Sequence, residues 1–373
     1  MKQLIHTLLI LLVAAMLLSC QNNSETLPVL RLGHAPHDHH SPLYIAAMKP
    51  DFFKENGGIY LKEIIYQKEY RLFSGSRDLA RVVVDSSTGG KELIRKLSEE
   101  YFDISFGGFP AMLHFIDQGS PIKILAPIMT EGAGLLVAND LPVSNWEEFI
   151  AYAQQRRNPL KIGYKTAVSV QNLIFEYALQ ESIVPYATSA NDPSAKIIGL
   201  NLHGPKNLIP ALENGLIDGF VIMQPYLALA EEKGVGKTIT MLSDMPPHGK
   251  WKGIPCCALA ANDHFSQSHP EVTEAIVTLI LRANQFITEN PAESATLVAR
   301  WLQVPESVEK KALSTIIFTT DYTDAWNNGV DFWTHSMIQS GRMKSKVKKA
   351  YEEGRLEQEI YNRNLYDIVR EQL

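Results

Sequence analysis

The stretch Phe102-Asp103-Ile104-Ser105-Phe106-Gly107-Gly108-Phe109-Pro110 decides the fold, because it passes directly from a strand into a helix. The run from Asp103 to Gly108 is typical of a short buried strand, and Pro110 suits the first turn of the helix that follows. Other strand candidates flank this stretch and alternate with helical segments; they are residues 29–33, 81–85 and 122–128. The alternation predicts a doubly wound α/β sheet.

A second set of alternating strands and helices follows the first. Its strand candidates are residues 135–138, 160–164, 197–202 and 219–223. About 350 residues remain after the leader described below, which is more than one hydrophobic core usually supports. We therefore expect two lobes, with residues 29–132 in lobe I, 133–255 in lobe II, and 256–373 returning to lobe I and forming the C-terminal helices.

The first twenty residues are predicted to be a targeting segment. Lys2 precedes an almost purely apolar run from Leu8 to Leu18, which is too short to span a bilayer. The ending Leu17-Leu18-Ser19-Cys20 is similar to a bacterial lipobox, in which the cysteine receives a lipid. We expect residues 1–20 to be a lipoprotein signal peptide with lipidation at Cys20, and residues 21–28 to be a polar tether. An ordinary secretory signal is the alternative.

Composition excludes some classes of function. The chain carries 35 basic and 41 acidic residues, a net charge of −6. Loss of Lys2 with the leader leaves 34 against 41, a net charge of −7. Such a mildly acidic chain gives no reason to expect nucleic acid as a partner, because that requires a clustered basic face.

Besides Cys20, the chain has only the adjacent pair Cys256 and Cys257. Neighbouring cysteines rarely reach disulfide geometry, so no disulfide framework is expected. A buried pair of small apolar residues near the hinge is the simplest interpretation of these two residues.

Loops at the carboxyl ends of strands are the candidates for the binding site, since open α/β sheets bind ligands there. The predicted ligand contacts combine imidazole, hydroxyl and amide groups with glycines that allow close approach; they are His37, His39, His40, Ser41, Ser87, Thr88, Gly107, Gly108, Thr166, Ser169, Gln171 and Gln224. Each has a structural alternative: a helix cap for Ser41, a polar turn for the stretch containing Ser87 and Thr88, and tight packing for the two glycines. The candidates come from both halves of the chain, which predicts a pocket between the lobes.

The histidine-rich stretch from His34 to His40 also suggests a metal site, since imidazole and carboxylate suit zinc or nickel. His37 and His39 are its weak candidates. The stretch offers five possible ligands, which are His34, His37, Asp38, His39 and His40. They cannot all converge on one ion from a single turn, so we expect solute contact here and no metal or other cofactor.

Several segments resemble one family of binding proteins. These are His40-Ser41-Pro42-Leu43-Tyr44-Ile45-Ala46, residues 102–110 with Gly119-Ser120-Pro121-Ile122-Lys123-Ile124, Leu212 to Gly219 with Gln224-Pro225-Tyr226, and the His269-Pro270-Glu271 and Asn290-Pro291 marks. In this order they are similar to the nitrate/sulfonate/taurine and thiamine-pyrimidine-precursor group of periplasmic binding proteins. The resemblance covers roughly residues 29–305.

The resemblance implies a type II periplasmic-binding-protein fold, with two doubly wound lobes joined by a two-strand hinge. It implies a monomeric, exported solute-binding lipoprotein that closes on a small organic ligand and delivers it to an ABC permease and its ATPase. A nitrogen heterocycle, such as a thiamine pyrimidine precursor, or a sulfonate is the expected ligand, and no catalysis is expected. The alternatives are an enzyme like the thiamine-pyrimidine synthase, from whose longer Cys-rich run this chain departs, and a metal-binding lipoprotein using the cluster from His34 to His40.

Overall fold

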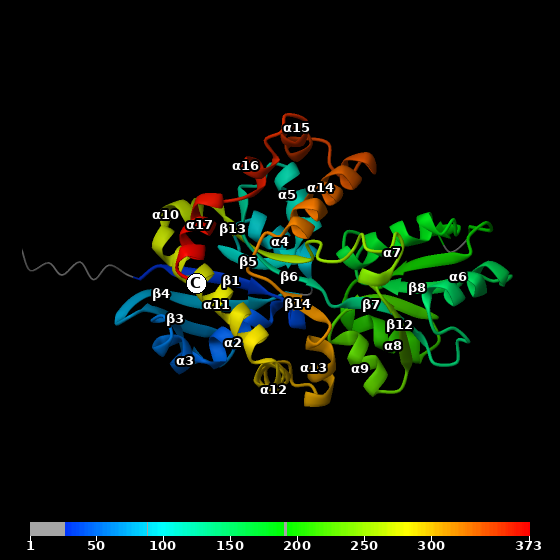
Figure 1. Cartoon of the computed structure of the whole chain (residues 1–373), viewed down its shortest axis with the longest axis horizontal. Helices are drawn as coiled ribbons and strands as arrows, with labels where there is room; N and C mark the ends of the chain where they lie inside the picture. The colour runs from blue at the N-terminus through cyan, green and yellow to red at the C-terminus, as the bar shows by residue number, and fades with distance from the viewer. Residues whose placement is uncertain (1–26, 88, 190–191) are drawn as a thin grey trace, which may run out of the picture.

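Two mixed β-sheets, each covered by helices, form the two lobes of the protein (Figure 1). The computed structural model describes residues 27–87, 89–189 and 192–373. The predicted signal peptide, the predicted lipidation site Cys20 and the candidate Thr88 lie outside the described residues. Within the described ranges, none of the helices combines the length and the apolar character that crossing a bilayer requires.

The sheet of lobe I has eight strands in the order β14-β6-β13-β5-β1-β4-β3-β2. Its strands are β1 (Val29–His34), β2 (Ile59–Ile65), β3 (Glu69–Ser74), β4 (Arg77–Ser86), β5 (Ile104–Gly108), β6 (Ile122–Glu131), β13 (Cys257–Asn262) and β14 (Ile316–Phe318). Strand β1 lies at the centre and pairs in parallel with β4 and β5, with Leu32 opposite Val84 and Ile104. Strand β13 runs antiparallel to β5 and β6.

The sheet of lobe II has six strands in the order β12-β7-β11-β8-β10-β9. They are β7 (Ala133–Ala138), β8 (Leu160–Tyr164), β9 (Tyr186–Ala187), β10 (Ile197–Asn201), β11 (Gly219–Met223) and β12 (Gly236–Met241). Strands β8 to β11 pair in parallel, while β7 runs antiparallel to both β11 and β12. The α/β fold with two sheets expected from the sequence is thus confirmed.

The helices complete the two lobes. Lobe I carries α2 (Ser41–Met48), α3 (Pro50–Glu55), α4 (Gly90–Ser98), α5 (Phe109–Asp117), α10 (Asp263–Ser268), α11 (Pro270–Glu289), α12 (Pro291–Leu302), α13 (Glu306–Leu313), α14 (Asp324–Gln339), α15 (Lys346–Glu352), α16 (Leu356–Ile360) and α17 (Arg363–Glu371). Lobe II carries α6 (Trp146–Gln155), α7 (Val170–Glu181), α8 (Leu208–Glu213) and α9 (Tyr226–Glu232). Short 3-10 turns lie at Asp38–His40, Pro205–Asn207 and Leu242–Asp244.

The decisive stretch folds as its residue types dictate. Residues Ile104 to Phe106 are fully buried in β5, and Pro110 sits in the first turn of α5, where its missing N–H is not needed. Asp103 just before the strand accepts hydrogen bonds from the backbone N–H, Nε and Nη2 of Arg31, at 2.7, 3.0 and 2.6 Å. This bidentate contact ties β5 to the neighbouring β1.

Two segments cross between the lobes. The first joins β6 to β7 through Gly132, whose φ of +64° is a left-handed conformation that favours glycine. The second returns through Pro255 and Cys256 into β13. These two crossings form the hinge expected from the sequence.

A helix near the C-terminus also contacts both lobes. Phe332 of α14 packs edge-to-face on Tyr177 of α7, with ring centroids 5.4 Å apart. Just beyond α14, Nη2 of Arg342 lies 3.2 Å from a carboxylate oxygen of Glu176. Lobe II is therefore held by this contact as well as by the two crossings (Figure 1).

Candidate functional site

The histidine-rich loop after β1 is held rigidly by its own hydrogen bonds. The Tyr44 hydroxyl donates to the carbonyl of Ala35 at 2.9 Å, and His40 Nδ1 accepts from the Ala35 N–H, also at 2.9 Å. The Ser41 hydroxyl donates to the carbonyl of Asp38 at 2.6 Å. His37, His39 and His40 are all buried, so the loop holds three imidazoles beside the hinge.

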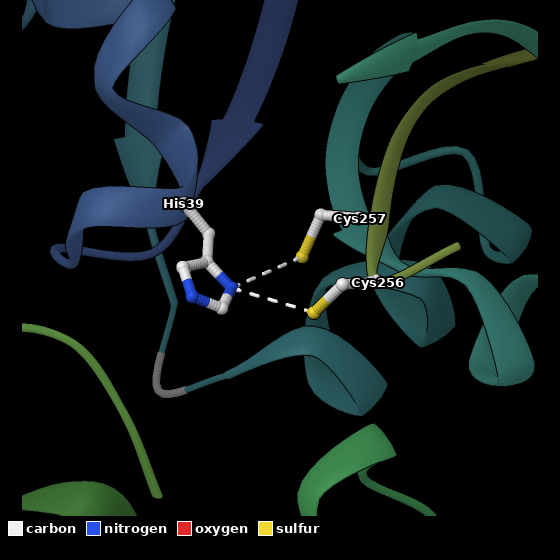
Figure 2. Close-up of side chains that lie close together, drawn as sticks. All are labelled: His39, Cys256 and Cys257. Atoms are coloured by element: carbon white, nitrogen blue, oxygen red, sulfur yellow. Dashed lines mark hydrogen bonds between the residues drawn. The ribbon is translucent and has the colours of Figure 1, made fainter. Parts of the chain in front are cut away.

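The two cysteines of the second crossing lie against one of these imidazoles. Nδ1 of His39 is 3.5 Å from Sγ of Cys256 and 3.8 Å from Sγ of Cys257. Figure 2 shows the ring edge of His39 turned toward both sulfur atoms. The other ring nitrogen, Nε2, lies 3.1 Å from the carbonyl oxygen of Gly132 on the first crossing. His39 thus joins both hinge segments.

An inner cavity of about 30 Å³ lies next to this cluster. Lobe I and the second crossing contribute His37, His39, His40, Gly90, Lys91, Gly108, Ala111, Cys256 and Cys257; lobe II contributes Lys165, Thr166, Val168, Ser169, Val170 and Gln171. A cavity of that volume accommodates an ion or about two water molecules, because one water requires roughly 10–15 Å³ measured this way.

A larger outer cavity of about 320 Å³ also lies between the lobes. Its walls are Ala35, Pro36, His37, Ser86 and Ser87 from lobe I, and His203, Gly204, Pro205, Lys206, Asn207 and Tyr226 from lobe II. This volume is in the range of sites for small organic ligands. His37 borders both cavities.

Burial favours the neutral form of three imidazoles here, those of His34, His37 and His40. It lowers the pKa of His34 to about 3, and it lowers the pKa values of His37 and His40, with neighbouring imidazoles adding to the effect at His34 and His37. Burial also lowers the pKa of Lys165, which enters the inner cavity from lobe II. A hydrogen bond from Cys256 lowers the pKa of Cys257, and the same bond raises that of Cys256.

A pair of buried carboxyl groups lies beside the same loop. Asp38 and Glu309 of α13 are both fully buried, and no donor among the described residues reaches their side-chain oxygens. Burial raises the pKa of Asp38, and the nearby charge of Glu309 raises it further. Burial also raises the pKa of Glu309, to about 7. The two groups are close enough to share a proton, which satisfies them without an external donor.

The structure gathers most of the predicted contact residues at the two cavities. His37, His39, His40, Gly108, Thr166, Ser169 and Gln171 line the inner cavity, and His37 and Ser87 line the outer one.

Three predicted contacts lie elsewhere. Gly107 is packed closely under Ile94, and the Ser41 hydroxyl is used within its own loop. Gln224 accepts from the N–H of Ala228 at 3.2 Å, within the start of α9. These three residues serve packing and local hydrogen bonding.

Several lining residues were missed in the sequence. Lys165 directly precedes the predicted contact Thr166, but a single lysine in a loop is too common to indicate a binding site. The residues from His203 to Asn207 follow β10, so the rule of carboxyl ends would have found them. Cys256 and Cys257 were interpreted as apolar filling; the structure buries them as expected but turns their sulfur atoms toward His39. No local signal in the sequence indicates that approach.

The chain is similar in sequence to several known proteins. An uncharacterized protein of Methanocaldococcus jannaschii, MJ1180, is 33% identical over 137 residues, which are 36% of this chain and 94% of that protein. The bicarbonate-binding protein CmpA of Synechococcus elongatus is 25% identical over 203 residues, 51% of this chain and 42% of CmpA. The chain therefore spans less than half of the length of that relative.

A solved structure shares the fold over most of both chains. It is the ligand-binding component of an ABC-type import system from Staphylococcus aureus with zinc bound, which superposes with a TM-score of 0.67 at 15% identity and covers 91% of this chain and 98% of its own. At that identity the likeness concerns the fold alone. The sequence model of the NMT1-like family matches residues 23–303. The resemblance that the segments indicated is thereby confirmed, and the chain belongs to the NMT1-like family.

Proposed function

We propose that this protein is the solute-binding component of an ABC importer and that its two lobes close on a small organic molecule in the outer cavity. The observation that carries the proposal is the composition of that cavity, whose walls come from both lobes. A ligand shifts a protein toward a closed state only if it binds that state better, and contacts to both lobes supply this difference. The S. aureus import component with the same fold and the relative CmpA support the transport role.

The cavity chemistry favours an uncharged or singly anionic ligand. His37, Tyr226 and Asn207 offer aromatic and hydrogen-bonding groups, while Lys206 is the cation in the outer wall. Such a wall suits a planar nitrogen heterocycle, for example a thiamine pyrimidine precursor. A sulfonate is the second candidate and would pair with Lys206. Burial lowers the pKa of His37, so this imidazole binds as a neutral group.

The location and partners follow from the same role. We propose that the chain is exported, that a lipid on Cys20 holds it at a membrane, and that residues 21–28 tether a monomeric body. Its partners would then be the solute, an ABC permease and the ATPase of that permease. Labelling with a radioactive or clickable fatty acid would show incorporation in the full chain and none in Cys20→Ala. Incorporation in that variant would refute the anchor.

The experiment for the ligand starts from protein purified without unfolding. Mass spectrometry under native conditions should detect a small molecule released on denaturation, and X-ray scattering should show compaction when that molecule is added back. Lys206→Ala should weaken binding about tenfold or more if the ligand is anionic. Lys233→Ala is the control, because Lys233 lies in the same lobe and pairs with Glu213 outside the cavity. Catalytic turnover or a covalent change in the intact mass would refute the transport role in favour of a synthase-like enzyme.

A further inference from the structure

We propose that His39, Cys256 and Cys257 bind a thiophilic d10 metal ion, Zn²⁺ or Cu⁺, in the inner cavity at the crossing of the two hinge segments. The three side chains are buried, and their ligand atoms all lie within 4.8 Å of one another. This site is separate from the outer cavity, so the inference does not depend on the identity of the solute.

The hydrogen bonding of His39 leaves the lone pair of Nδ1 available to bind a metal ion. A carbonyl oxygen can only accept, so the contact of 3.1 Å between Nε2 and the Gly132 carbonyl places the proton on Nε2. Nδ1 then carries the lone pair, and it is Nδ1 that faces both sulfur atoms (Figure 2). Metal-binding histidines usually donate their second ring N–H to a carbonyl or carboxylate, which fixes the tautomer and the ring orientation.

The distances also match a shared ion. With Zn–S of about 2.3 Å and Zn–N of about 2.0 Å, a tetrahedral site separates the sulfur and nitrogen ligands by about 3.5 Å. The observed separations from His39 Nδ1 are 3.5 Å to Cys256 Sγ and 3.8 Å to Cys257 Sγ. Both sulfur atoms therefore lie close to the spacing from Nδ1 that a tetrahedral ion requires, and the two sulfur atoms lie within 4.8 Å of each other.

A hydrogen bond to His39 explains only one of the two sulfur contacts. The single lone pair of Nδ1 accepts one S–H, yet two sulfur atoms approach it at similar distances. A hydrogen bond to Nδ1 therefore accounts for one of these contacts, while the hydrogen bond between Cys256 and Cys257 engages the second sulfur atom. An ion between the three atoms accounts for both contacts at once.

The surroundings supply charge and an open coordination position. Lys165 lines the same cavity and offsets part of the negative charge of two thiolates. Nδ1 of His37 and Nε2 of His40, both on the cavity wall, are buried and have no hydrogen-bond partner among the described residues. With three protein ligands, the fourth position faces a cavity of about 30 Å³, where a water molecule or one of these nitrogens completes the tetrahedron.

The ligand set selects the class of ion. Two thiolates and one imidazole are soft to borderline ligands, which favour Cu⁺ and Zn²⁺ over Mg²⁺, Ca²⁺ or Mn²⁺. The tetrahedral spacing suits ions without a geometric preference of their own, as d10 ions are. We therefore expect Zn²⁺ to be bound and Mg²⁺ and Mn²⁺ to be rejected.

The test uses the full chain without an affinity tag, reduced and stripped of metal under anaerobic conditions. After addition of Zn²⁺ and desalting, elemental analysis should find one zinc per chain. Co²⁺ in place of zinc should give the intense near-ultraviolet absorption of thiolate-to-metal charge transfer. The double variant Cys256→Ser with Cys257→Ser and the variant His39→Ala should lower bound zinc to the background level. His248→Ala is the matched control, because His248 is exposed and lines neither cavity, and it should keep the full stoichiometry.

Three results would overturn the assignment. They are zinc bound equally by the parent and the double serine variant, cobalt binding without the charge-transfer absorption, and a reduced protein with native circular dichroism that binds no zinc or copper. A fold check by circular dichroism on each variant separates loss of the site from loss of the structure. If zinc fails to bind while a solute is still carried through purification, the transport role stands and only the metal site falls.

Discussion

The buried carboxyl group of Glu309 gives the sharpest test of the electrostatics beside the hinge. Replacing Glu309 with Gln keeps the size and polarity of the side chain but removes its titration. In the native protein, burial raises the pKa of this group from 4.5 to about 7. Asp38 faces it directly, and Tyr44 and Tyr226 are the other titratable side chains affected by this pair.

The sign follows from the linkage between protonation and folding. Between pH 4.5 and pH 7 the folded protein holds a proton on Glu309 that the unfolded chain has already released. The contribution of Glu309 to stability is therefore fully present below pH 4.5 and is lost as the pH rises through about 7. At about 1.4 kcal/mol per pH unit, this interval corresponds to a loss of about 3 kcal/mol. Glu309→Gln should abolish the loss.

The assay is urea unfolding of the parent and of Glu309→Gln, followed by tryptophan fluorescence from pH 4.5 to pH 8. Buried histidines titrate in both proteins, so the difference between the two curves reports on Glu309 together with its effect on the pKa of Asp38. The variant should gain stability relative to the parent as the pH rises, reaching an advantage of about 3 kcal/mol near pH 8.

Parallel curves over the whole range would refute this reasoning, because they would mean that Glu309 titrates alike in the folded and unfolded chains. Glu306→Gln is the control on the same helix. Glu306 is exposed and pairs with Lys310 at 2.7 Å. Glu306→Gln should show no gain in the free energy of unfolding over the parent at high pH.

Three further outcomes are expected. Burial lowers the pKa of His34 to about 3, so its contribution to stability should fall as the pH drops below 6.5, and His34→Phe should flatten that slope in urea unfolding. Gly132→Ala should cost about 1–3 kcal/mol more than Gly119→Ala, because both glycines have positive φ but only the former would press on Ile316 and His39; a thermal scan with equal losses would contradict this. Asp117 accepts N–H bonds from Lys344, Ser345, Val347 and Lys348, so Asp117→Asn should cost about 1.5–3 kcal/mol and speed amide exchange in α15, whereas unchanged exchange would exclude this role.

The sequence predicted the core of the fold because buried strands have a strong local pattern. Residues 104–108 and 122–128 are short, mostly apolar runs, and the structure contains strands there. The hairpin of β2 and β3 was missed. Its strands carry charged residues such as Lys62, Glu63 and Arg71, and Ile64 and Ile65 are both exposed, so alternation is lost. Tertiary pairing with β4 makes this segment a hairpin, and no local signal announces it.

For the candidate site as well, the features with a local sequence pattern were predicted and the long-range contacts were not. The position of the histidine loop followed from one rule, that ligands lie at the carboxyl ends of strands. The approach of Cys256 to His39 spans 217 positions in the chain and depends on how the second crossing enters β13. Likewise, the small volume of the inner cavity results from the packing of both lobes around Lys165. Contacts of this range are set by topology, which a single sequence does not display.

The packing of α14 on α7 has a consequence for how the chain can be shortened. The part that matches the family ends at residue 303, yet Phe332 and Arg342, which grip Tyr177 and Glu176, lie beyond it. A fragment that ends at residue 303 would keep the lobe II sheet and strands β1 to β6 and β13 of lobe I, but it would lose the edge strand β14 and these contacts of Phe332 and Arg342. The residues beyond 303 therefore add a connection between the lobes that the matched part of the chain does not contain.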